Sequence, residues 1–309
     1  METNIETNIE TDIETSIKDN INKILSNNQK KLLLDYKGID TLVFSGGGAK
    51  GLSYIGILKK LEELNIINNI NSIAGTSIGA FFGSLIIIGY TSQELVDFVS
   101  LFNLSNMKKI SPTNFFSYFG IDDGNNLEVI LEKMFNLKGC HKNITYKELF
   151  EKTKKELIIS GVCINEKKCH YFSHKNTPEM SVLKSIRIST SIPLYFNPVQ
   201  YNNMLWVDGG IIDHYPMHLF QHKLNTTLGF YLSESIGYSE IKNLEDYFLC
   251  IIQSLYEGMT EREIKGFENN TIIIKSNKYN VLETNFSKET ILKYINSGYD
   301  SITNYLGVI

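Results

Sequence analysis

The chain has 309 residues, of which 42% are hydrophobic, and its formal net charge is −4. This length allows one large α/β domain or two small ones with a sizeable buried core. The small negative charge gives no overall signal for nucleic-acid binding or for strong attraction to an anionic membrane.

Residues 1–36 differ in composition from the rest of the chain. They begin with a low-complexity repeat in which isoleucine recurs every 4 residues from Ile5 to Ile17. We expect a low-complexity or helical extension over 1–36, followed by one domain over 37–309. The N-terminal segment lacks the apolar core of a signal peptide, and no apolar run is long enough to span a bilayer. We therefore expect a cytoplasmic protein whose contact with membranes is peripheral.

The cysteines show neither a disulfide framework nor a metal-binding pattern. Their spacing, at Cys140, Cys163, Cys169 and Cys250, favours free thiols in a reducing compartment. Cys163, Cys169 and His170 lack the second ligand pair that a zinc site needs, so we expect no bound metal.

The domain opens with an alternation of strands and helices. A short apolar strand over Thr41–Phe44 leads into a glycine-rich loop, and a helix with one apolar face follows. A second strand over Ser72–Gly75 leads to another apolar helix. This order predicts parallel strands joined by crossover helices.

Further elements follow from periodicity and turn residues. We expect helices over Ser92–Leu104, Asn125–Leu137, Pro178–Thr190, Asn243–Lys265 and Lys288–Leu306, and strands over Glu156–Ile164, Lys168–Ser173, Val199–Tyr201, Met204–Val207, Thr227–Leu232 and Thr271–Lys275. The aromatic segment Ser111–Gly120 is interpreted either as core packing or as an apolar loop that covers a site.

The segment Gly75-Thr76-Ser77-Ile78-Gly79 occupies the sharp turn between the second strand and its helix. The two glycines let the chain turn tightly and let the helix pass close to the strand. The turn lifts the Ser77 hydroxyl above the sheet edge, and the helix N-terminus offers free N–H groups to an oxyanion. The pattern predicts Ser77 as a nucleophile; the alternative is a solvated serine in a structural turn.

Two hypotheses fit the loop Gly46-Gly47-Gly48-Ala49-Lys50-Gly51. Its N–H groups can turn toward one point and bind an oxyanion. Gly46, Gly48 and Gly51 also match a dinucleotide-binding turn, which would make the chain an oxidoreductase. That fold needs an acidic residue at the end of the second strand, where this chain has the Ser77 turn. The oxyanion hypothesis is therefore favoured.

A serine nucleophile needs a base, and two arrangements are open. Asp208 follows a strand and precedes Gly209-Gly210, so nothing bulky keeps its carboxylate from a serine. In a site with little water, the pKa of that carboxylate can rise toward a useful value. His214 follows 6 residues later and keeps a Ser–Asp–His triad open. The structural alternative for Asp208 is an ordinary Asp-Gly turn.

Together these motifs resemble the patatin-like phospholipase family. The resemblance spans Leu42 to Met217 and includes the glycine loop, the Ser77 turn, Asp208-Gly209-Gly210 and the segment Ser189–Phe196. It implies a three-layer α/β/α fold with a mostly parallel central sheet. It also implies a Ser77–Asp208 dyad. The implied oxyanion hole consists of Gly46, Gly47, Gly48 and Ile78, with Lys50, Gly51, Gly75, Gly79, Gly209 and Gly210 as supporting residues.

The resemblance implies a lipid acyl hydrolase of the phospholipase A or lysophospholipase type that works through an acyl-enzyme. It implies a phospholipid or lysophospholipid substrate, peripheral membrane contact, and no cofactor or nucleic acid. Lys50 stands where many relatives have arginine, and His214 stands where asparagine is common. The alternatives are the dinucleotide-binding oxidoreductase and an inactive lipid-binding module.

Overall fold

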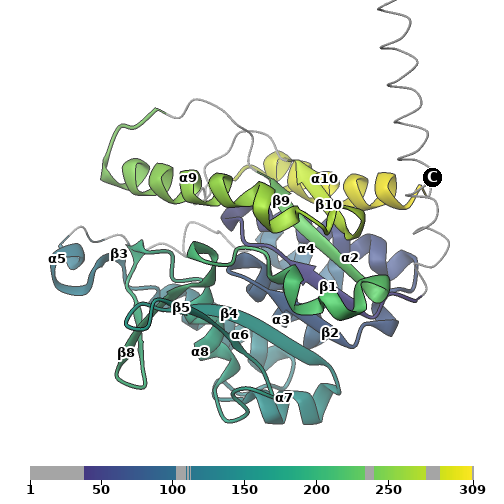
Figure 1. Ribbon diagram of the computed structural model, residues 1–309, viewed down its shortest axis with the longest axis horizontal. Coiled ribbons are helices and arrows are strands. Elements are labelled where there is room, and N and C mark those ends of the chain that lie inside the picture. Colours follow the sequence, from purple (N-terminus) through teal and green to yellow (C-terminus); the bar gives the residue numbers. More distant parts are fainter. Residues whose placement is uncertain are drawn as a thin grey trace, which may run out of the picture.

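The computed structural model describes residues 38–101, 109, 111, 113–233, 240–275 and 286–307. The extension expected over 1–36 lies outside the described residues, as does the end of the helix expected over Ser92–Leu104. Figure 1 shows the described chain as helices packed around a central sheet.

Most strands of the described residues belong to one eight-stranded sheet. They are β1 (Thr41–Phe44), β2 (Ser72–Gly75), β4 (Glu156–Cys163), β5 (Lys168–Phe172), β7 (Val199–Tyr201), β8 (Met204–Asp208), β9 (Thr227–Ser233) and β10 (Thr271–Lys275). The strand order is β10-β9-β1-β2-β4-β8-β7, with β5 also paired to β4. The pairs from β10 to β4 are parallel, and β5, β7 and β8 pair antiparallel. The expected α/β fold with a mostly parallel centre is confirmed.

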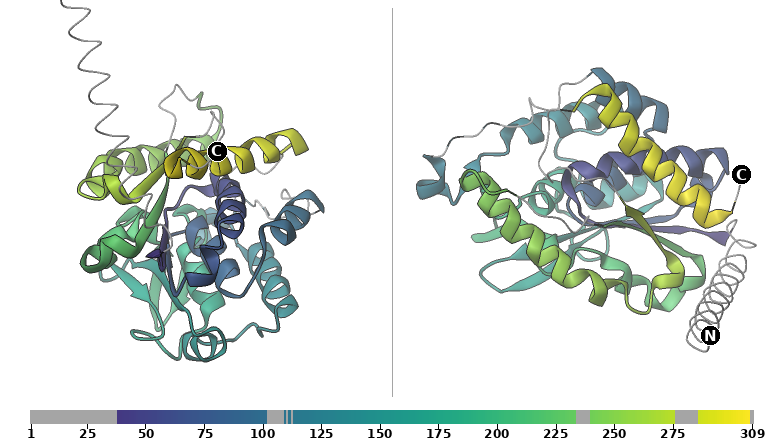
Figure 2. Two further views of the ribbon diagram at one scale, coloured as in Figure 1. Left: turned by 90° about the vertical axis from the view of Figure 1, so that its right-hand side faces the viewer. Right: turned by 90° about the horizontal axis from the view of Figure 1, so that it is seen from above.

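Helices cover both faces of this sheet and give the expected three layers. One face shares its core with α2 (Ser53–Glu63), α3 (Ile78–Ile87), α4 (Ser92–Leu101), α6 (Asn125–Leu137), α7 (Tyr146–Thr153), α8 (Val182–Ser189) and α10 (Lys288–Leu306). The 3-10 helix η6 (Pro216–Thr226) and the end of α9 (Leu244–Ile264) cover the other face. The right-hand view of Figure 2 shows α9 and α10 on opposite sides of the sheet.

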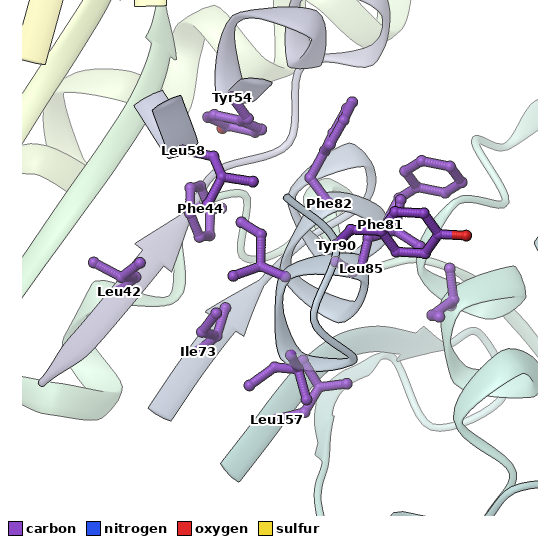
Figure 3. Close-up of a cluster of buried hydrophobic side chains, with 14 of the residues drawn as sticks. Leu42, Phe44, Tyr54, Leu58, Ile73, Phe81, Phe82, Leu85, Tyr90 and Leu157 are labelled. Carbon is purple, nitrogen blue, oxygen red and sulfur yellow. The ribbon is translucent and has the colours of Figure 1, made fainter. Parts of the chain in front are cut away.

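Side-chain alternation along β1 explains why both faces are covered. Leu42 and Phe44 point into the larger core, while Val43 belongs to the smaller core under η6. In the larger core, shown in Figure 3, the Phe44 ring stacks on Phe230 at 5.1 Å and meets Tyr54 edge-on at 4.8 Å. Parallel strands buried on both faces are near-continuous apolar runs, and β1 is apolar from Leu42 to Phe44.

Two local expectations need correction. The segment Ser111–Gly120 is not a plain loop, because it contains the short helix α5 (Asn114–Tyr118); residue 112 lies outside the described part. The helix expected from Pro178 begins at Val182, because Ser181 caps it by accepting a hydrogen bond from the Lys184 N–H.

Some elements were not anticipated from sequence. Helix α7 begins at a capping box in which Thr145 and Glu148 accept from each other's backbone N–H groups. A separate pair of short parallel strands, β3 (Gly120–Asp122) and β6 (Leu194–Phe196), follows α5 and α8. Both strands lie near α9 and are too short for a periodicity argument.

The sheet register brings three segments to one edge. Phe44 at the end of β1 pairs with Gly75 at the end of β2, so the glycine loop and the Ser77 turn leave the sheet side by side. Strand β4 continues past β2, because Gly75 pairs with Ile159 and four further residues follow. The antiparallel β8 ends with Asp208 opposite Gly161, just beyond that level. Asp208 therefore reaches the Ser77 turn from the opposite direction.

Candidate active site

Ser77 occupies a strained turn. Strand β2 ends at Gly75, α3 begins at Ile78, and Ser77 has φ 55° and ψ −121°, which is uncommon for a residue with a side chain. The flanking glycines are required by close packing. A Cβ on Gly79 would lie 2.4 Å from the Phe44 carbonyl oxygen, and one on Gly75 would lie 2.5 Å from the Gly79 backbone. The geometry is that of a nucleophile elbow.

Asp208 contacts Ser77 directly. The Ser77 hydroxyl donates to Asp208 Oδ2 with an O···O distance of 2.5 Å, and the Gly210 N–H donates to Oδ1 at 2.7 Å. The Ser77 residue is 6% exposed and Asp208 is fully buried. The structure therefore brings together the two residues that the sequence analysis named as nucleophile and base, with nothing between them.

Burial shapes the acidity of Asp208. Loss of hydration raises the pKa of its carboxyl from 3.8 to about 7, against the opposing effect of hydrogen bonds from Ser77 and Gly210. A carboxyl with a pKa near neutrality can both take and return a proton near pH 7. This is the property that the direct-base hypothesis requires.

The glycine loop supplies hydrogen-bond donors beside Ser77. Gly47 and Gly48 have φ values of 149° and 55°, and within the described structure neither N–H donates a hydrogen bond. The same holds for the N–H of Ile78, the first residue of α3. A Cβ on Gly46 would lie 3.4 Å from Ser77 Cβ, so the loop packs against the nucleophile. These three free N–H groups can stabilise a negative oxygen there.

Gly46 does not fit the donor role expected of it. Its N–H donates to the carbonyl oxygen of His214 with an N···O distance of 3.0 Å. This N–H is therefore already hydrogen-bonded. The absence of a side chain at Gly46 lets the loop pass close to His214 and Ser77. A Cβ at this position would lie 2.6 Å from His214 Cε1.

Three further residues that the motifs predicted lie close to these groups. Lys50 is buried and lies close enough to His214 to affect its titration. A Cβ on Gly51 would lie 2.2 Å from an Ile78 side-chain carbon, so the loop packs tightly on the start of α3. A Cβ on Gly209 would lie 2.1 Å from Ser160 Oγ.

The segment after α8 fixes both members of the pair. Ser189 Oγ accepts the Ser77 N–H at 2.9 Å, and the Ser191 carbonyl accepts the Asp208 N–H at 2.9 Å. The sequence analysis noted this small-residue segment but gave its serines no role. The sequence signal for these contacts is the run of small side chains shortly before Pro193, because small side chains let two backbone segments approach closely.

His214 lies beside the pair but is not hydrogen-bonded to it. Within the described structure, no hydrogen bond joins its ring to Ser77 or Asp208, and its Nδ1 has no partner. Its ring packs on Tyr256 with centroids 4.3 Å apart. Burial, helped by the nearby Lys50 charge, lowers the pKa of His214 to about 3. At neutral pH the imidazole is therefore uncharged.

Among the described residues, no group of three or more histidine, cysteine, aspartate or glutamate side chains is arranged to hold a metal ion. None of the described helices is long and apolar enough to cross a membrane.

Comparison with known proteins gives consistent matches. Residues 42–220 match the family model described as patatin-like phospholipase. The probable lipid hydrolase 463L of Invertebrate iridescent virus 6 is 34% identical over 62% of this chain and 67% of its own length. A stretch of 49 residues is 55% identical to the lysophospholipase NTE1 of Kluyveromyces lactis, covering 16% of this chain and 3% of that protein. The structure of VipD from Legionella pneumophila aligns with a TM-score of 0.57 at 18% identity, over 87% of this chain and 67% of VipD.

The buried Asp208 carboxyl predicts a pH-dependent stability difference. Because its pKa is raised on folding, the folded protein loses stability as pH rises from about 4 to about 7, and Asp208→Asn removes this loss. The free energy of unfolding of Asp208→Asn, relative to that of wild type, should therefore increase as pH rises, by at most about 4 kcal/mol at pH 8. Urea unfolding at pH 5 and pH 8 measures this. A stability difference that stays constant between the two pH values would contradict the buried, weakly acidic carboxyl.

Proposed function

The chain belongs to the patatin-like phospholipase family, and from this premise we propose that it is a serine acyl hydrolase in which Ser77 is the nucleophile and Asp208 the base. The observation that carries the proposal is the 2.5 Å hydrogen bond from the Ser77 hydroxyl to the buried Asp208 carboxylate. Membership of the family makes the chain a lipid hydrolase in the broad sense. The dyad, the acyl-enzyme and the substrate class are the proposed refinements.

The first half of the proposed reaction forms an acyl-enzyme. Asp208 takes the Ser77 proton while Ser77 Oγ attacks the ester carbonyl carbon, and the carbonyl oxygen becomes an oxyanion. The free N–H groups of Gly47, Gly48 and Ile78 stabilise this oxyanion. The tetrahedral intermediate then collapses, the protonated Asp208 gives its proton to the leaving alcohol oxygen, and the acyl group stays on Ser77.

The second half releases the fatty acid. A water molecule gives a proton to Asp208 as its oxygen attacks the acyl carbonyl carbon. Collapse of this second intermediate breaks the bond to Ser77 Oγ, which recovers its proton from Asp208. Atoms and protons balance without a cofactor or metal ion, so we propose none.

We propose a phospholipid or lysophospholipid as substrate. The short, highly identical stretch shared with a protein named lysophospholipase supports this class, together with the family. Apolar side chains also gather around the site. Ile192, next to Ser191, belongs to a buried cluster with Ile121, Tyr195 and the α9 residues Ile252 and Tyr256. An apolar cluster beside the site suits contact with an acyl chain.

The catalytic domain is proposed to span 37–309, with residues 1–36 as an extension. The single large sheet supports these boundaries, because its strands come from residues between Thr41 and Lys275. Helix α10 packs beside α2 and completes the larger core.

Peripheral contact with a lipid surface is proposed through helices α5 and α9. Their exposed apolar residues form what we term the α5–α9 surface: Phe116, Tyr118, Phe119, Leu244, Tyr247, Ile251 and Leu255. Phe115 and Phe248 stack at 5.3 Å beneath it and hold the two helices together, at the end of the molecule where Figure 1 shows both.

Two properties of the α5–α9 surface fit a lipid bilayer. Residues 114–121 and 247–256 contain no charged residue, although Phe116 is 88% exposed. The same helix α9 carries Ile252 and Tyr256 into the cluster beside the site. A lipid surface docked here would therefore lie near the proposed acyl-binding residues.

The dyad predicts a clear ranking of variants. Ser77→Ala and Asp208→Asn should each lower fatty-acid release from mixed phospholipid vesicles by about 10³-fold or more, because each removes a group that takes part in bond making. His214→Asn should stay within about tenfold of wild type, since its ring makes no hydrogen bond to the pair. Below about pH 7, kcat/KM should fall as Asp208 is protonated.

These measurements include a chelator and are made on folded variants. Equal loss in His214→Asn and Asp208→Asn would restore the triad. Vesicle binding by wild type without any hydrolysis would favour the inactive lipid-binding module instead.

The α5–α9 surface predicts a loss that depends on how the substrate is presented. The variant Phe116→Ser/Tyr247→Ser/Ile251→Ser should bind vesicles about tenfold or more weakly, because apolar area no longer enters the lipid. Its hydrolysis of a water-soluble short-chain ester should be unchanged. Leu137→Ser/Ile164→Ser/Leu292→Ser changes exposed apolar residues elsewhere and is the matched control. Equal vesicle binding by both triple variants would disprove this surface.

A further inference from the structure

Helix α9 contains a partly buried acid that the proposed mechanism does not use. Glu263 lies near the end of α9, and its Oε1 accepts the backbone N–H of His214 at 2.6 Å. Burial raises the pKa of the Glu263 carboxyl to about 7, and the negative Asp213 acts in the same direction. Glu263 lies beyond residues 42–220, the part of the chain that matches the family model.

The His214 backbone links Glu263 to the glycine loop. Residue 214 donates its N–H to Glu263, and its carbonyl accepts the N–H of Gly46 at 3.0 Å. The His214 ring lies against Gly46 on one side and against Tyr256, also on α9, on the other. A continuous path of contacts therefore runs from α9 through residue 214 to the first residue of the loop.

The destabilisation that Glu263 causes indicates that its hydrogen bond to the His214 backbone has a role. Its second oxygen, Oε2, is buried and has no hydrogen-bond partner among the described residues. A buried carboxylate with one unsatisfied oxygen destabilises a fold more than an apolar side chain of similar size. What Glu263 Oε1 gains is a short hydrogen bond from the backbone N–H of His214, the residue whose carbonyl accepts the Gly46 N–H.

We propose that Glu263 is a positioning residue that holds the glycine loop, through the His214 backbone, in the geometry that binds the oxyanion. The inference rests on the proposed function, because it assigns the N–H groups of Gly47 and Gly48 to the oxyanion. Loss of the Glu263 acceptor frees residue 214 to move, and Gly46 moves with it. The free N–H groups of Gly47 and Gly48 then no longer point to one place.

Three variants separate positioning from other roles. Glu263→Ala removes the acceptor. Glu263→Gln keeps an amide oxygen that accepts the same N–H but carries no charge. Asn243→Ala removes the cap at the far end of α9, where Asn243 Oδ1 accepts the Asp246 N–H, and so weakens the helix by about 1 kcal/mol without touching residue 214.

The kinetic test uses a water-soluble short-chain ester, at a temperature where all variants are folded. Glu263→Ala should lower kcat by about tenfold to a hundredfold and leave KM within about twofold, because an oxyanion contact acts in the transition state. Glu263→Gln and Asn243→Ala should stay within about threefold of wild type. An unchanged kcat in Glu263→Ala would overturn the inference. So would an equal loss in Glu263→Gln, which would assign the effect to charge.

A second readout does not depend on activity. Amide hydrogen exchange of the peptide that carries Gly46–Gly48 should be faster in Glu263→Ala than in wild type, and unchanged in the other two variants. Exchange that is the same in all four proteins would overturn the positioning role. If wild type proves inactive while the exchange pattern holds, the proposed function fails and the anchoring of the loop by Glu263 stands.

Discussion

The hydrogen bond between Ser77 and Asp208 is the contact on which the rest of the site depends. Its two residues come from strands that run in opposite directions, so their meeting point is set by the sheet register. The segment after α8 then fixes both backbones, through Ser189 to Ser77 and through Ser191 to Asp208. Because Ser77 and Asp208 contact each other directly, a small shift of either strand would break their hydrogen bond.

This arrangement lowers the stability of the fold. Asp208 is a fully buried acid, Ser77 has a backbone conformation that side chains disfavour, and the glycine loop leaves N–H groups unpaired in the described structure. Each of these features lowers stability, and sites that do chemistry commonly carry such costs. The offset comes from the larger core, where Phe44 at the end of β1 stacks on Phe230 and meets Tyr54 edge-on next to the loop.

The sequence predicted the parts of this molecule that are encoded locally. The alternation of strands and helices from Thr41 to Gly79 predicted the parallel strands and the Ser77 turn. The residues that determine each of these elements and turns lie next to one another in the sequence. The pairing of Gly46 with His214 could not be predicted this way, since the two residues are brought together only by the sheet. Nothing in the periodicity of α9 marks Glu263 as the residue that reaches His214. The helix that begins after Thr145 is different, because its capping box is readable from sequence alone.

In the proposed mechanism Ser77 is the nucleophile, and Asp208 activates it without a histidine. The most direct test is the rate at which a fluorophosphonate ester labels the protein, with the modified residue found by peptide mass spectrometry. We expect one adduct, on Ser77, which forms about 10³-fold more slowly in Asp208→Asn and at a rate within about tenfold of wild type in His214→Asn. An adduct on another residue, or labelling of Ser77 that depends on His214 instead of Asp208, would contradict this mechanism.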